Sequence, residues 1–179
     1  MTSNGEFLLN EILPEFDVSA TYSIRIRASA DQIYSVLQQG IPSGMLTKVL
    51  MALRQIPRVF RPPDRTRRSE DAFYKLKQSQ NREIVIGIIG QFWKPAAKII
   101  TIHSLDEFLQ FKKNGYCKAA LNLRIQERNE RECILSTETR VRSFGSAKKP
   151  FQQYWRVIGP FSGLIRKEIL RKIKLKAEK

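Results

Sequence analysis

The strongest constraint on the fold lies in the C-terminal segment from Phe151 to about Lys174. Its large apolar side chains recur at about 3.6 residues, the period of an α-helix. They are Phe151, Tyr154, Trp155, Ile158, Ile165, Ile169 and Ile173. Polar and basic side chains, among them Gln152, Arg156 and Lys167, face the other way. A helix with one such apolar face has to bury it, so we expect it to close over a sheet.

Gly159 and Pro160 interrupt this pattern. Proline has no backbone N–H and its ring clashes with the preceding helical turn. The segment is therefore predicted to be either a kinked helix or two helices that meet at an angle.

Alternating apolar and polar residues predict strands in much of the remaining chain. The predicted strands are Ser19 to Arg27, Ala72 to Gln78, Glu83 to Trp93, Ala97 to His103, Tyr116 to Gln126 and Cys133 to Arg142. Short polar or glycine-bearing turns separate most of those after residue 72, which is typical of an antiparallel meander. The last two predicted strands form a hairpin that turns near Asn129. It is expected to carry Leu121 on its inner face and Asn122 on its outer face.

Two short helices are expected after the first strand. Ser29 can cap the first of them and Gln32 can reach back to it, and the second runs from Ser43 to Arg54 until Pro57 stops it. Arg58 to Glu70 then reads as a basic, proline-bearing loop, a candidate lid or docking segment.

The predicted fold class is α+β, with a curved antiparallel sheet wrapped around a long C-terminal helix. A length of 179 residues suits one domain, so residues 1–179 are expected to form a single domain, with residues 1–16 loosely ordered. No apolar run is long enough to span a bilayer and no signal sequence is evident, which favours the cytoplasm.

The sequence offers little for metal or redox chemistry. Cys117 and Cys133 lie too far apart along the predicted hairpin to face each other, so free buried thiols are expected. With His103 as the one histidine, no metal-ligand spacing is present, and we expect neither a metal nor a cofactor.

The chain carries 32 Lys and Arg against 17 Asp and Glu, a net charge of +15. This charge favours an acidic partner, such as an anionic membrane surface or a nucleic acid, although it does not choose between them. The excess concentrates in Arg54 to Arg68 and in Arg166 to Lys179. Two solvated, solubilising surfaces are the alternative interpretation, and in either case these side chains are expected to face water.

The order strand, two helices, antiparallel meander and long closing helix resembles the START-like superfamily, also called SRPBCC, which includes polyketide cyclases and plant allergens. Four stretches resemble a largely uncharacterised bacterial branch of it: Gly87 to Trp93, Thr137 to Val141, Phe151 to Trp155 and Ser162 to Arg166. The resemblance implies the helix-grip fold and a cavity between sheet and helix. Members hold lipids, polyketides, hormones or other apolar molecules there, and only some are enzymes.

Ser162 lies between Ile158 and Ile165 on the apolar face of the predicted helix, where its small side chain leaves room for a ligand. The alternative is a close helix-to-sheet contact. Tyr154, Trp155, Phe92, Trp93 and Tyr116 offer apolar surfaces, with polar tips on the tyrosines and tryptophans, that suit an amphipathic ligand, or they are core. Of these aromatic residues Tyr154, Trp155, Trp93 and Tyr116, together with Ile158, Ser162 and Ile165, are candidate ligand contacts.

Glu138 and Arg140 are further candidates, although strand alternation puts them on the outer face as part of a surface charge ladder. A bulge would turn the pair inward, where it could fix a polar head. Gly87 and Gly90, inside an apolar strand, predict a bend or a close approach rather than a ligand contact.

The favoured function is binding, or transport, of an apolar or amphipathic small molecule or lipid. A cyclase- or hydrolase-like enzyme in the same cavity is the first alternative, because catalytic sites assembled in space leave no local signature. Nucleic-acid binding through the basic stretches is the second, although these lack regularly interleaved aromatic residues. The sequence shows no nucleophile and base at a recognisable spacing, so binding is preferred over catalysis.

Overall fold

The computed structural model describes residues 7–39, 73–94 and 98–179, and for Phe161 and Ser162 it describes only the backbone. The elements of these residues are α1 (Leu8–Ile12), β1 (Val18–Ile26), α2 (Ala30–Gln38), β2 (Tyr74–Ser79), β3 (Glu83–Gly90), β4 (Ile99–Ile100), α4 (Leu105–Gln110), β5 (Cys117–Asn129), β6 (Glu132–Ser143), the short 3-10 helix η2 (Gly145–Ala147) and α5 (Lys148–Ala177). The predicted helix Ser43 to Arg54 and the basic loop Arg58 to Glu70 lie outside the described residues.

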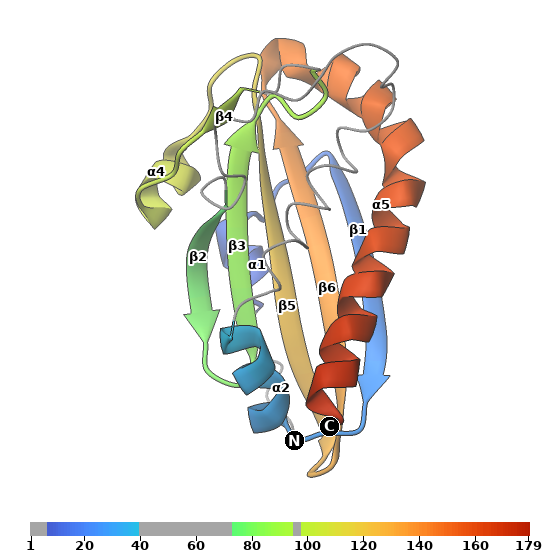
Figure 1. Ribbon diagram of the computed structural model, residues 1–179. Helices are drawn as coiled ribbons and strands as arrows, with labels where there is room; N and C mark the ends of the chain where they lie inside the picture. The colour runs from blue at the N-terminus through green and yellow to red at the C-terminus, as the bar shows by residue number, and fades with distance from the viewer. Residues whose placement is uncertain (1–6, 40–72, 95–97) are drawn as a thin grey trace.

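The strands form one sheet in the order β1-β6-β5-β3-β2, with the two-residue β4 paired to β3 (Figure 1). Every pairing is antiparallel, as the alternation of the sequence predicts. The long β5–β6 hairpin is the predicted one, and Arg124 pairs with Ser136 in it. The first strand joins the sheet beside the last, because β1 pairs with β6 along its whole length.

α5 lies across one face of this sheet, together with α2 (Figure 1). It is one helix that contains Pro160, and its ribbon bends in the first half (Figure 1), so the kinked-helix prediction is confirmed. α2 begins as predicted: Ser29 accepts a hydrogen bond from the backbone N–H of Gln32, whose side chain accepts one from the backbone N–H of Ser29. This capping box satisfies two backbone donors of the first turn.

Between α5 and the sheet, two apolar clusters fill the two ends of the interface. One joins α2 and the C-terminal half of α5 to the sheet, with Ile33, Leu135 and Ile169 buried in it. The other lies at the opposite end, around Ile88 and Phe151. The fold is therefore α+β, with an antiparallel sheet packed against a long C-terminal helix.

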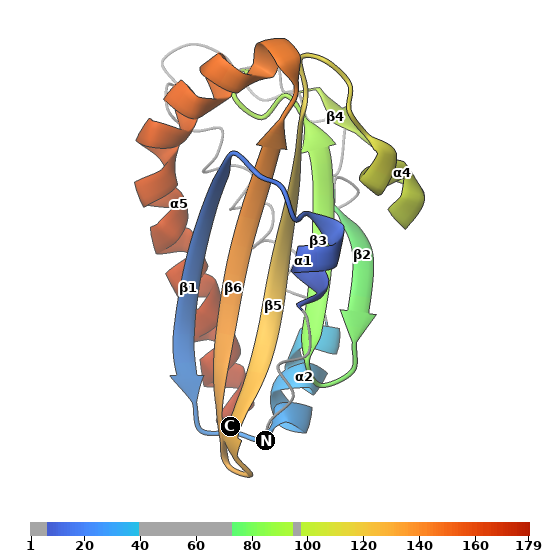
Figure 2. The same cartoon turned by 180° about the vertical axis from the view of Figure 1, so that it is seen from behind.

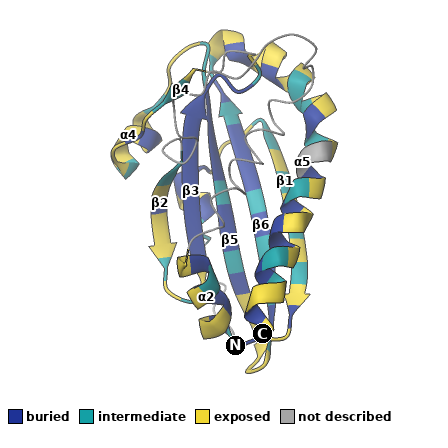
Figure 3. Cartoon of the chain, in the orientation of Figure 1, coloured by how far each residue is buried: buried dark blue, intermediate teal, exposed yellow. Residues whose placement is uncertain are grey.

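The back of the sheet is covered as well, which the sequence did not predict. Figure 2 shows α1 lying on that face. Leu9, Val85 and Phe108 belong to a third apolar cluster there. As a result β3 is buried along its entire length (Figure 3), and Asn122, expected on an outer solvated face, is buried.

The expectation of a loosely ordered segment over residues 1–16 is therefore wrong for the residues of α1. Leu9, Ile12 and Leu13 are all buried. Glu83 accepts hydrogen bonds from the Leu8 backbone N–H (2.9 Å) and from the Asn122 side-chain amide (2.7 Å). The segment is ordered because it supplies apolar cover for the back of the sheet and makes polar contacts to β2, β3 and β6.

Glycines in β3 mark close approaches, as predicted. A β-carbon on Gly87 would lie 2.5 Å from Leu76 Cδ1 and 2.9 Å from a Phe108 ring atom, and one on Gly90 would lie 2.8 Å from the Lys98 carbonyl oxygen. Cys117 and Cys133 are free and buried, as expected from their positions. Of the helices described, none is long and apolar enough to cross a bilayer.

Candidate ligand-binding site

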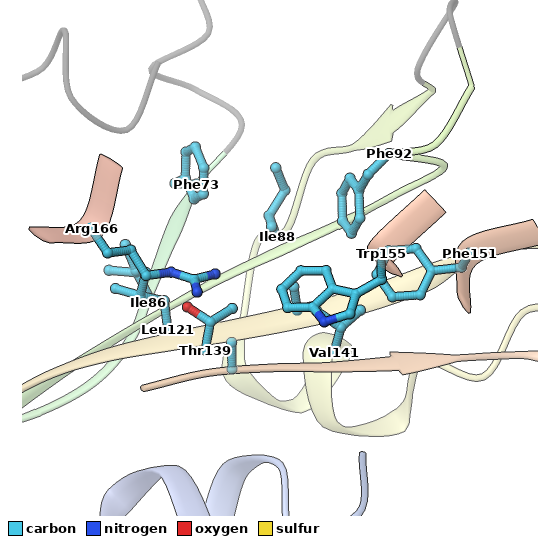
Figure 4. A pocket seen from close by; sticks show the side chains of 12 residues that line it. Phe73, Ile86, Ile88, Phe92, Leu121, Thr139, Val141, Phe151, Trp155 and Arg166 are labelled. Atoms are coloured by element: carbon cyan, nitrogen blue, oxygen red, sulfur yellow. The ribbon is translucent and has the colours of Figure 1, made fainter. Parts of the chain in front are cut away.

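A narrow apolar cavity lies between the sheet and α5, between the two clusters on that face. Its volume is about 40 Å³, inside a hollow of about 540 Å³ that includes open solvent. Side chains of β3, β5, β6 and α5 line it, together with Phe73 and Phe92 (Figure 4). A water needs roughly 10–15 Å³ of such space, so the cavity has room for a few waters only, and a larger molecule has to displace its walls.

Arg166 supplies the charge of this cavity. Its side chain comes from α5 and is 1% exposed, which corrects the expectation that the C-terminal basic residues all face water. Its guanidinium carbon lies 5.9 Å from the centre of the Tyr22 ring and 5.8 Å from that of Trp155. Within the described residues, Arg166 Nε and Nη1 have no hydrogen-bond acceptor. Burial lowers the pKa of this guanidinium to about 10, and interaction with Tyr22 opposes the shift.

Thr139 adds a hydroxyl to the same cavity from β6 (Figure 4). It is buried, and its Oγ1 has no partner among the residues that the structure describes. The neighbouring Thr137 differs, because its hydroxyl donates to the Asn122 carbonyl oxygen at 2.7 Å. The cavity thus combines apolar walls with two guanidinium nitrogens and a hydroxyl that have no hydrogen-bond partner among the described residues.

Among the candidate ligand contacts whose side chains the structure describes, Trp155 is the one that lines this cavity. Its ring packs against Phe151, with the ring centres 6.0 Å apart. Tyr154 also packs against Phe151. Ile158 is fully buried, and Ile165 packs against the cluster beside α2.

The remaining predicted contacts lie elsewhere. Trp93 packs edge-on against Phe151, next to the cavity but not in its wall. Tyr116 packs edge-on against Phe111, and Lys113 Nζ lies 5.2 Å from the centre of its ring. The side chain of Ser162 lies outside the described part of the chain.

Glu138 and Arg140 lie on the back of the sheet, the face to which strand alternation assigns them. β1 pairs with β6 in unbroken register through both residues, so the alternative in which a bulge turns the pair inward to meet a ligand is wrong. Arg140 donates from Nε to Glu138 (2.6 Å), and from its terminal nitrogens to the Leu13 carbonyl oxygen (3.1 Å) and the Asn10 side chain (2.7 Å). The pair clamps the N-terminal segment to the sheet.

Sequence reasoning missed most of the cavity wall. Phe92 is noted as an aromatic surface but not as a candidate contact, and the residues missed altogether are Phe73, Ile86, Ile88, Ala119, Ala120, Leu121, Thr139, Val141, Phe151 and Arg166. A signal for Arg166 was present: it comes three helical turns after Trp155 and two before Ile173, which puts it on the apolar face. A charged residue at such a position is a functional candidate, because unpaired arginines are seldom buried.

A second, more polar hollow lies on the back of the sheet, around α1, Lys118 and Arg142. Lys118 Nζ donates to the carbonyl oxygens of Phe108 (3.1 Å) and Leu109 (2.9 Å), near the end of α4. Burial, together with the nearby charges of Arg142 and Lys112, lowers its pKa to about 8. Because Lys118 already has partners and Arg142 pairs with Glu15, the first cavity is the better candidate.

Comparison with known proteins adds the wider setting. No protein-family model and no curated protein matches the sequence. Structural neighbours do exist, and they are START-like proteins. One is a conserved protein from Geobacillus kaustophilus, with 14% identity over 89% of this chain and 95% of the other and a TM-score of 0.41.

Two further neighbours are enzymes. The Zhui aromatase/cyclase from Streptomyces sp. R1128 shows 13% identity over 90% of this chain and 93% of its own, with a TM-score of 0.34. Norcoclaurine synthase from Thalictrum flavum, in complex with dopamine and hydroxybenzaldehyde, shows 12% identity over 98% and 96%, with a TM-score of 0.35. These similarities concern the arrangement of the chain and carry no statement about what it binds.

Proposed function

We propose that the chain binds an apolar or amphipathic small molecule in the cavity between the sheet and α5. The observation that carries this proposal is the cavity itself. It interrupts the apolar packing between α5 and the sheet, where protein interiors are otherwise close-packed. A mostly apolar wall with few polar groups is the usual composition of a small-molecule site.

Binding is favoured over catalysis by the polar groups in the wall. Among the described residues that line the cavity, Arg166 and Thr139 are the ones with a charged or hydroxyl-bearing side chain. A guanidinium and a hydroxyl can orient a ligand, whereas general acid–base catalysis needs a group that exchanges a proton near neutral pH. Arg166, with a pKa of about 10, stays protonated there.

Nucleic-acid binding has less support from the described residues. The basic face of α5 carries exposed Lys167, Arg171 and Lys176. Such a face attracts any polyanion, membrane surfaces included. It provides no feature that reads bases, so it does not select a nucleic acid as the partner.

The proposal is tested with the tryptophan of the cavity wall. The protein has two tryptophans, so Trp93→Phe leaves Trp155 as the remaining reporter. Titration with the neutral apolar dye N-phenyl-1-naphthylamine is expected to quench Trp155 and to raise dye emission saturably. Native mass spectrometry of the freshly purified protein provides a second readout, because a retained cargo appears as an added mass.

Two substitutions locate the site. Ala119 lines the cavity, so Ala119→Phe fills it and is expected to abolish dye uptake while the far-UV circular dichroism spectrum is kept. Val157→Phe is the matched control, because Val157 on α5 is 53% exposed and a larger side chain there meets solvent. Dye uptake that survives Ala119→Phe in a folded protein would place binding outside this cavity.

A further inference from the structure

Arg166 is a buried cation that lines the cavity, and its Nε and Nη1 have no hydrogen-bond acceptor among the residues that the structure describes. No ion pair joins it to an acidic side chain within residues 7–39, 73–94 and 98–179. Its neighbours are the aromatic rings of Tyr22 and Trp155, which attract a cation but accept no strong hydrogen bond. Buried charges in proteins are normally paired and hydrogen-bonded, and the described part of the chain supplies no counter-charge for this one.

The Thr139 hydroxyl, on the opposite wall of the cavity, is a second buried polar group without a hydrogen-bond partner among the described residues. Arg166 reaches the cavity from α5 and Thr139 from β6, and Figure 4 shows both side chains projecting between the two walls. The unpartnered atoms are two guanidinium nitrogens, which only donate, and a hydroxyl, which can donate. One ligand group with several acceptor oxygens satisfies all three.

We propose that Arg166 and Thr139 bind the carboxylate of an amphipathic organic acid, whose apolar body lies against Phe92, Phe151 and Trp155. This inference rests on the proposed function and names the chemical class of the ligand. A guanidinium presents parallel N–H groups that match the two oxygens of a carboxylate. The ligand is slim, since the cavity is narrow.

The charge state of the pair supports the assignment. The pKa of Arg166 is lowered only to about 10, so the guanidinium is charged at neutral pH, where a carboxylic acid with a pKa near 4 is ionised. The acid supplies the missing counter-charge in a site with little water. A neutral ligand of the same length leaves the guanidinium unpaired.

The test compares decanoate with decanol, two slim molecules with the same chain length and different head groups. Isothermal titration calorimetry at pH 7.5 is expected to show decanoate binding roughly 10- to 100-fold more tightly than decanol, as a charge-assisted hydrogen-bonded pair provides. Arg166→Met replaces the guanidinium with an apolar side chain of similar length. It is expected to remove this preference while decanol still binds. Thr139→Val is expected to weaken decanoate binding several-fold and to leave decanol unchanged.

Arg171→Gln is the matched control, because Arg171 is an exposed arginine of the same helix and its loss changes the net charge equally. It is expected to leave the preference intact. Arg166→Lys keeps the charge and is read out in the same way if Arg166→Met does not fold, with a reduced preference expected from its single-point ammonium.

The outcomes separate the two proposals. Equal binding of decanoate and decanol by the wild type, or a preference for decanoate that Arg166→Met and Arg166→Lys both leave unchanged, overturns the carboxylate assignment while small-molecule binding stands. Binding of neither molecule, with no uptake of the neutral dye, overturns the proposed function itself.

Discussion

Gly163 of α5 lies against the phenol ring of Tyr22 on β1 so closely that a β-carbon on Gly163 would overlap the Tyr22 hydroxyl. The same β-carbon would lie 2.7 Å from the ring carbon that carries the hydroxyl. This contact lets the middle of the helix approach the first strand next to Arg166. The distance between helix and sheet beside the cavity is therefore set by the absence of a side chain at Gly163.

Gly163→Ala is expected to lower the free energy of unfolding by about 1–3 kcal/mol, the usual cost of overpacking. Alanine favours a helix over glycine by about 0.5–1 kcal/mol, which offsets part of that cost. In a Tyr22→Phe background the nearest clashing atom is absent, so Gly163→Ala should cost less there. Urea unfolding of the four proteins measures the coupling, and a coupling near zero would show that the hydroxyl does not set the contact.

Arg140→Met is expected to release the N-terminal segment and to cost about 1–3 kcal/mol, because hydrogen bonds to Leu13, Asn10 and Glu138 are lost from a largely buried cation. Hydrogen exchange should rise in α1 and leave α5 unaffected. Arg25→Gln is the control, since Arg25 forms an exposed pair with Glu132 at 3.6 Å, a kind of pair that contributes about 0–1 kcal/mol. Unchanged exchange in α1 would contradict the clamp.

Arg166→Met is expected to raise the stability of the ligand-free protein by about 1–3 kcal/mol at pH 7, because a buried, unpaired charge is removed. The sign of the pH dependence follows from the lowered pKa. From about 10, the folded pKa, up to the higher pKa of an arginine in the unfolded chain, the unfolded chain binds more protons, so the wild type gains stability as pH rises. The stability difference between Arg166→Met and the wild type should therefore shrink above pH 10. A wild type more stable than Arg166→Met at pH 7 would show that the charge of Arg166 is compensated in the ligand-free protein.

Lys118 should also make the stability of the protein depend on pH, at lower pH than Arg166 does. Burial lowers the pKa of Lys118 from 10.5 to about 8. The protonated form is the one that folding disfavours. Relative to Lys118→Met, the wild type should therefore gain stability as pH rises from about 8 towards 10.5. Urea unfolding at pH 7 and pH 9.5 checks this, with Lys77→Met as the control, because Lys77 is a largely exposed partner of Glu11. A stability difference between the wild type and Lys118→Met that does not change with pH would show that Lys118 is in contact with water.

The parts of the fold that follow from short-range periodicity were predictable from the sequence. The alternation in β5 and β6, the capping box at Ser29 and the apolar stripe of α5 all reflect neighbours that are two to four residues apart. The cover on the back of the sheet did not follow, because Leu9 and Phe108 reach that face only through the tertiary fold. For the same reason Asn122 and Arg140 were expected to face solvent.

The site was less predictable than the fold. Trp155 was identified from its place on the apolar stripe, and the same rule would have found Arg166, which was counted with the basic surface instead. Thr139 could not be found this way, because its strand neighbour Thr137 has the same chemistry and the same phase. What distinguishes them is that Thr137 has an acceptor in β5, which a sequence does not show.

Because successive residues of β6 point to opposite sides, Thr139 and Arg140 perform separate tasks although they are adjacent in the chain. One faces the cavity and the other holds the N-terminal segment, with the sheet between them. Substitutions at alternate positions of β5 and β6 can therefore reshape the chamber without loosening the clamp. A protein engineer can therefore change the two faces of the sheet independently. Mutations that accumulate over time can likewise alter the ligand preference on one face while the other face continues to hold the fold together.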